Sequence, residues 1–101
     1  MNVNEAWARL MVVDVAAALP TALEVLGNPS HYDEQDYTIM DEARHVLVVA
    51  VRVELDRRGV ELDEAEQESL RMWLSAGEWS GREHLTAADI ADEWQSLEGG
   101  N

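Results

Sequence analysis

The chain has 101 residues, no cysteine, and 21 acidic residues against seven basic ones, all of them arginine, so its net charge is −14. A surface this negative repels nucleic acid and anionic membranes and attracts basic partners, so we expect no direct binding to nucleic acid or membrane. The hydrophobic content of 47% is too high for a disordered acidic tail, and the missing cysteines exclude disulfides and thiolate metal sites.

The apolar run near the N-terminus, residues 10–19, does not resemble a signal peptide. It lacks a basic lead-in and is interrupted by Asp14. No run reaches the roughly 18 apolar residues of a membrane span. We therefore expect a cytoplasmic protein.

The first predicted element is a long helix from Asn4 to Leu19, with Asn4 as its N-cap. Apolar residues recur along it at helical spacing, so we expect it to be largely buried. Pro20 suits the first turn of a short second helix, which Gly27 would end. Residues 27–38 are rich in Gly, Asn, Pro and Ser, which predicts a loop.

A second long helix is predicted to begin at Thr38, with Asp41 in the place of a capping-box acid, and to end at the Arg-Arg-Gly sequence that finishes at Gly59. Residues 46–55 are rich in β-branched side chains and also fit a strand. Helix is favoured because the start and stop signals agree and no other segment offers a pairing strand, but the strand alternative stays open.

Two further helices follow. Asp63 and Glu66 form a capping box at the start of one, which Gly77 would end, and Thr86 with Asp89 caps the other. The buried face of the first is predicted to comprise Leu62, Ala65, Ser69, Met72, Trp73 and Ala76. The buried face of the second is predicted to comprise Ala87, Ile90, Ala91, Trp94 and Leu97. Residues 97–101 should fray, and residues 1–101 should form one small acidic all-α domain, a compact bundle of four to five helices.

The densest acidic stretch, residues 61–68, has five carboxylates and no base. Most of it has a structural explanation, because acids at a cap or in a first turn are stabilised by the helix dipole. Along the whole chain, seven acids lie in such positions and seven more can be assigned to the seven arginines, which leaves seven without a local role. If crowded carboxylates repel one another in the fold, some of them have raised pKa values, and at low salt the protein should then be more stable near pH 5 than near pH 8.

The sequence offers little for catalysis or metal binding. Glu42 and His45 form a single Glu-x-x-His motif, whereas a di-iron bundle needs two, and Asp41–His45 fits a helical surface pair equally well. Residues 33–44 lack the central glycine and final glutamate of an EF-hand loop. We therefore expect no enzyme activity, no metal and no cofactor.

The aromatic residues allow two interpretations. Trp7, Trp73 and Trp94 lie on apolar helix faces and are expected in the core. Trp79 lies in a loop beside acidic residues, where it fits the edge of the core or an exposed interface anchor. Tyr32 and Tyr37 flank an acidic loop and allow the same two interpretations.

These observations favour a non-enzymatic protein that binds and inhibits a basic, nucleic-acid-handling partner. In size and charge the chain resembles small phage anti-defence proteins, DNA mimics and nuclease-immunity proteins. The alternative is an assembly chaperone or adaptor that binds through its Trp and Tyr loops and uses its charge for solubility. The oligomeric state stays open. The residues expected to bind the partner are Asp33, Glu34, Asp36, Tyr37, Glu61, Glu64, Glu68, Trp79, Asp92 and Glu93.

Overall fold

The computed structural model describes residues 2–33 and 38–99, and within them it shows helices and no strand. The all-α prediction is confirmed, although this part of the chain holds six helices and four to five were expected. The helices are α1 (Val3–Leu10), α2 (Val15–Gly27), α3 (Pro29–Asp33), α4 (Thr38–Arg57), α5 (Glu64–Ala76) and α6 (Ala87–Gly99).

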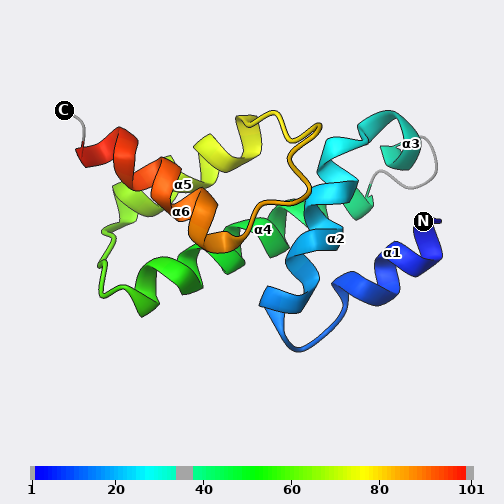
Figure 1. The fold of residues 1–101 in the computed structure, drawn as a ribbon, viewed down its shortest axis with the longest axis horizontal. Helices are drawn as coiled ribbons and strands as arrows, with labels where there is room; N and C mark the ends of the chain where they lie inside the picture. Colours follow the sequence, from blue (N-terminus) through cyan, green and yellow to red (C-terminus); the bar gives the residue numbers. More distant parts are fainter. Residues whose placement is uncertain (1, 34–37, 100–101) are drawn as a thin grey trace.

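The longest helix, α4, runs through the middle of the molecule and contacts every other helix (Figure 1). Helices α1 and α3 lie at one end of it, and α5 and α6 lie at the other. The buried residues accordingly form two clusters that share α2 and α4. One contains Ala6, Leu10 and Tyr32, and the other contains Leu70 and Trp94.

Residues 46–55 lie inside α4, as predicted, and the strand alternative is wrong. The helix ends in a Schellman motif, in which the Gly59 N–H donates to Asp56 O and the Val60 N–H donates to Leu55 O. Gly59 takes φ +77°, a left-handed conformation in which a side chain would be strained. The local end signal was therefore sufficient to place this helix.

The predicted helix from Asn4 to Leu19 is wrong, because the chain breaks after Leu10 and folds back into α2. Asn2 caps α1 in place of Asn4, and Asp14 caps α2 by accepting from the Ala16 N–H. The fold-back packs α1 against α2 and buries Leu10, which a continuous helix would carry away from α2.

Two other boundaries differ from the predictions. Pro20 lies within α2 instead of starting a new helix, and the predicted loop contains the short helix α3. The last helix continues to Gly99, through positions where fraying was expected, while residues 100–101 lie outside the described part.

The buried faces of the last two helices also needed correction. Leu70 and Leu74 are the buried residues of α5, whereas Met72 on the predicted face is 60% exposed. On α6, Trp94 is buried as predicted, but Leu97 is 57% exposed. An apolar side chain therefore lies open at the end of the bundle where α5 and α6 pack on α4.

Candidate partner-binding surface

The predicted acidic residues of the stretch 61–68 lie at the start of α5. Glu61, Glu64 and Glu68 are exposed, and Glu64 and Glu68 share one helix face because they are four residues apart. Glu68 forms an ion pair with Arg71, three residues further along the helix. Within the described residues, Glu61 and Glu64 have neither an ion pair nor a hydrogen-bonded side chain.

The remaining two acids of this stretch have the predicted structural role. Asp63 Oδ1 accepts from the Glu66 N–H at 2.8 Å, and Glu66 Oε1 accepts from the Asp63 N–H at 3.3 Å. This reciprocal capping box stabilises the first turn of α5.

Glu61 also lines a shallow groove of about 570 Å³ where α4 turns into α5. Asp56 lines the same groove and is exposed. Arg52 is there as well, and it donates to Gln67 Oε1 at 3.2 Å. Asp56 and Glu61 therefore form an acidic patch that one arginine borders without pairing to it.

Asp92 and Glu93 on α6, which were predicted to bind the partner, each pair with an arginine that is distant in sequence. Arg58 NH1 lies 2.7 Å from Asp92 Oδ1, and Arg82 forms an ion pair with Glu93. The first pair spans 34 residues and the second spans 11, so helix periodicity could not reveal either.

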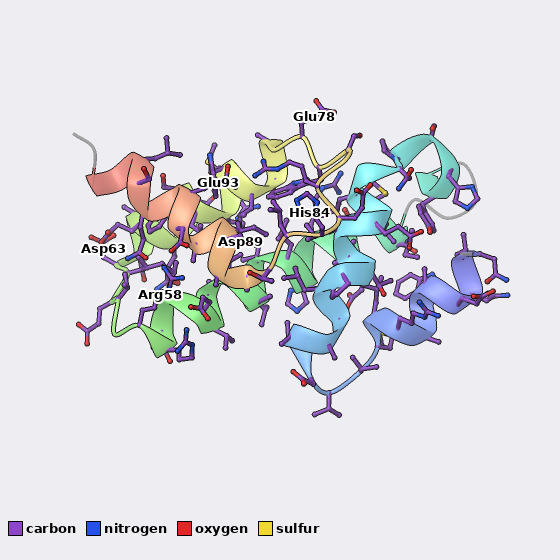
Figure 2. All side chains as sticks on the ribbon, in the orientation of Figure 1. Arg58, Asp63, Glu78, His84, Asp89 and Glu93 are labelled. Carbon is purple, nitrogen blue, oxygen red and sulfur yellow. The ribbon has the colours of Figure 1, made fainter. Side chains whose placement is uncertain are left out.

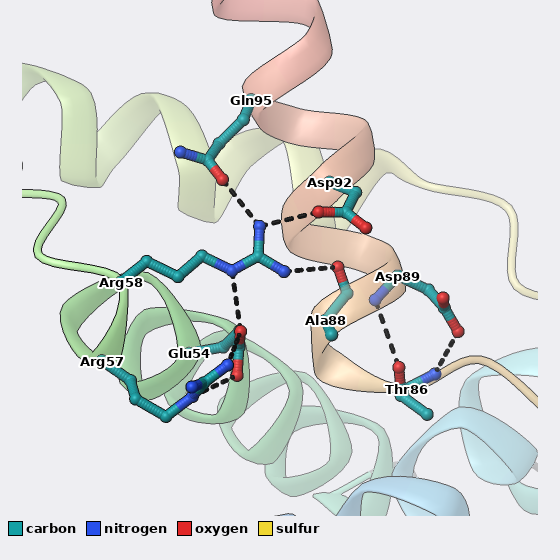
Figure 3. A network of polar contacts seen from close by, with 8 residues as sticks. All are labelled: Glu54, Arg57, Arg58, Thr86, Ala88, Asp89, Asp92 and Gln95. Atoms are coloured by element: carbon teal, nitrogen blue, oxygen red, sulfur yellow. Dashed lines mark hydrogen bonds and ion pairs between the residues drawn. The ribbon is translucent and has the colours of Figure 1, made fainter.

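The Arg58 guanidinium joins the end of α4 to α6 (Figure 3). Besides Asp92, it donates to Gln95 Oε1 at 2.8 Å and to the Ala88 carbonyl at 3.2 Å, and its Nε donates to Glu54 at 2.7 Å. Hydrogen bonds from Arg57 and then from Arg58 lower the pKa of Glu54 to about 2. The network holds α6 in position on α4.

The lowered pKa of Glu54 is part of a pattern. Hydrogen bonds from Arg71 lower the pKa of Glu68, and the capping N–H of Thr86 lowers the pKa of Asp89. The prediction that crowding raises the pKa of some carboxyl groups therefore gains no support from these three. In each case the hydrogen bonds to the charged form outweigh the desolvation that opposes them.

Trp79 is 5% exposed, so the interpretation as an exposed anchor is wrong and the core-edge interpretation is confirmed. Its indole N–H donates to the Leu74 carbonyl at 3.1 Å, and the Arg82 guanidinium carbon lies 5.1 Å from its ring centroid. Tyr32 is also buried, and burial is the largest cause of its raised pKa.

Three predicted residues, Trp79, Asp92 and Glu93, line a single groove of about 610 Å³ between α5 and α6. Figure 2 shows Glu93 beside α5 and Glu78 at the outer edge of the neighbouring loop. Sequence reasoning missed the other important lining residues, Trp73 and Leu97, because it assigned both to the core. The sequence did offer one signal for this groove, because Leu97 is an apolar residue near the end of the last predicted helix.

The second predicted acidic segment cannot be placed in this way. Glu34, Asp36 and Tyr37 lie outside the described residues, and the side chain of Asp33 does too. Their predicted role in partner binding stays a prediction.

Two further features concern the part of the chain that the structure describes. No group of three or more His, Asp or Glu side chains is arranged to hold a metal ion, and His45 is exposed on α4. None of the helices combines the length and the apolar character needed to span a bilayer.

Comparison of the chain with protein-family models, with curated proteins and with solved structures found no match.

Proposed function

We propose that this protein is a non-enzymatic acidic binder that occupies the nucleic-acid-binding surface of a basic partner protein and inhibits it. The observation that carries the proposal is the acidic patch at the α4–α5 connection. Asp56 and Glu61 are exposed in this patch, and Glu64 is exposed nearby in sequence in the first turn of α5. Within the described residues none of the three is neutralised by an arginine. Exposed charges of one sign cost stability through self-repulsion. A partner that binds these carboxylates would explain why the protein retains them.

The spacing of the carboxylates supports a nucleic-acid-handling partner. Glu64 and Glu68, the second of which also pairs with Arg71, are one helical turn apart, and side chains at this spacing lie about 5–6 Å from each other. That separation is comparable with the spacing of phosphates along a strand. A channel that binds phosphates through arginine and lysine can therefore bind such a row of carboxylates.

The test begins with capture of the partner from the source cell and its purification. Its binding to the wild-type protein is compared with binding to Glu61→Gln/Glu64→Gln. We expect about tenfold weaker binding, or about 1.4 kcal/mol, mainly through slower association, because long-range attraction steers the encounter. Duplex DNA should compete with the wild-type protein for the partner.

The matched control is Glu5→Gln/Glu78→Gln, which removes the same charge from two exposed acids on other parts of the molecule. This control should bind within about twofold of the wild-type protein. If Glu61→Gln/Glu64→Gln also keeps wild-type affinity at low salt, or if DNA fails to compete, the proposal is wrong.

An assembly chaperone or adaptor is the second candidate, and the open apolar groove at Leu97 favours it. In that case binding would depend on the groove and the charge would serve solubility. A salt series separates the two functions, because steering by exposed charge weakens as salt increases and apolar docking does not.

A further inference from the structure

The groove between α5 and α6 has an apolar floor. Trp73 is half-buried against the core, the buried Trp79 lies beside it, and Leu97 is 57% exposed on the opposite helix. Both helices pack on α4, so the groove walls are held by the core and by the Arg58 network. An exposed leucine beside two tryptophans is an apolar surface available to a partner.

The rim of this groove presents negative charge outward. In the pair of Asp92 with Arg58, the carboxylate side chain is 69% exposed and the arginine 24%. In the pair of Glu93 with Arg82, the values are 43% and 35%. Each arginine binds one oxygen of its carboxylate, Asp92 Oδ1 or Glu93 Oε2. Within the described residues, the second oxygen of each carboxylate accepts no hydrogen bond. A partner approaching the groove therefore meets carboxylate oxygens that can still accept hydrogen bonds.

The groove already accommodates a guanidinium from its own chain. Arg82 lies over the indole of Trp79 and at the same time forms an ion pair with Glu93. A cation on an aromatic face next to a carboxylate is a favourable arrangement for arginine. An arginine of a partner can make the same kind of ion pair with the outer carboxylate oxygens of Asp92 and Glu93.

We infer that the α5–α6 groove docks a basic amphipathic helix of a partner protein. An apolar anchor of that helix would lie on Trp73 and Leu97, and arginine or lysine one turn away would reach Asp92 and Glu93. This inference rests on the proposed function, since it names the part of the basic partner that is recognised. At about 610 Å³ the open groove takes one or two large side chains of a helix that lies across it.

Charge selects this occupant over a second copy of the chain. Residues 61–101 hold eleven acids and two arginines, and the whole chain has a net charge of −14. Two copies facing each other through this groove would bring like charges together, which opposes association. A basic helix brings the opposite charge and covers the exposed leucine as well.

The test uses NMR of the isotope-labelled protein titrated with a synthetic helical peptide that has leucine at every third or fourth position and arginine on both flanks. We expect the indole N–H signal of Trp73 to shift. The indole N–H of Trp7 is the internal reference and should not move, because Trp7 packs against the other core cluster. Two control peptides, one with glutamate replacing arginine and one with serine replacing leucine, should bind at least about tenfold more weakly.

Variants of the protein locate the contact. Leu97→Ser should weaken binding of the arginine-flanked peptide at least about fivefold, because it removes the exposed part of the apolar floor. Met72→Ser is the matched control, since Met72 is also exposed (60%) but does not line the groove. It should change the affinity by less than about twofold.

The outcomes separate this inference from the proposed function. If the arginine-flanked peptide binds but shifts only amides near Glu61 and Glu64, and Leu97→Ser has no effect, the docking site is wrong while the basic partner is supported. The docking site is equally wrong if the serine-substituted peptide binds as tightly, or if the glutamate-flanked peptide does. Absence of any peptide binding also overturns it, and the proposed function is then decided by the captured partner alone.

Discussion

Replacing Trp79 by alanine should test how far this loop residue belongs to the core. An aromatic side chain buries about 150–250 Å², which at about 25 cal/mol per Å² corresponds to roughly 4–6 kcal/mol. Alanine keeps the Cβ, and the unfolded chain already buries part of this surface, so we expect the free energy of unfolding to fall by about 3–5 kcal/mol. Small domains have only about 5–15 kcal/mol in total, so this single change would remove a large part of the stability.

Trp79→Phe separates the ring from the hydrogen bond. It keeps most of the apolar contact but removes the indole N–H that donates to the Leu74 carbonyl. Losing this hydrogen bond should cost about 1 kcal/mol, and the smaller ring adds a cavity, so we expect a total loss of about 1–2 kcal/mol.

The assay is urea denaturation followed by far-UV circular dichroism, with linear extrapolation to water. Met72→Ala on the exposed side of α5 is the control and should change the free energy of unfolding by no more than about 0.5 kcal/mol. If Trp79→Ala costs less than about 1 kcal/mol, the indole does not support the core and the reasoning from burial is refuted. Weaker partner binding by Trp79→Ala is therefore no evidence of a direct contact unless the variant is shown to be folded.

Three further outcomes follow from the same contacts. Gly27→Ala should cost about 1–3 kcal/mol in thermal or urea denaturation, because a Cβ there would lie 2.8 Å from the backbone oxygen of Trp79; an unchanged midpoint would show that the loop does not pack on α2 as described. Asp63→Ala should cost about 1 kcal/mol through loss of the α5 cap, and Asp63→Asn should recover most of it; equal losses in both variants would contradict the cap. Glu54, whose pKa is lowered to about 2 by Arg57 and Arg58, contributes stability that is complete above its unfolded-state pKa near 4.5 and is lost as the pH falls through 2. Urea midpoints measured across this range should fall more steeply for the wild-type protein than for Glu54→Gln, and parallel curves would count against the ion pairs.

The sequence alone determined the elements whose signals are local. The end of α4 at Gly59, the Asp63 cap of α5 and the Thr86 cap of α6 all depend on hydrogen bonds between residues a few positions apart. Such bonds can be predicted from sequence because the chain geometry of a helix terminus fixes which residues meet. The all-α class followed from these signals, together with the lack of a pairing strand for residues 46–55.

Tertiary structure decided which faces are covered and which charges meet. Leu10 is buried only because α1 folds back on α2, and Leu97 is exposed only because α6 packs on α4 through its other face. Trp79 could not be assigned from its acidic neighbours, since its burial depends on contacts with α5. Arg58 meets Asp92 across 34 residues of chain, a pairing that exists only once both helices are docked. The groove with its carboxylate rim is therefore a property of the packed helices, because no local rule relates residues so far apart in sequence.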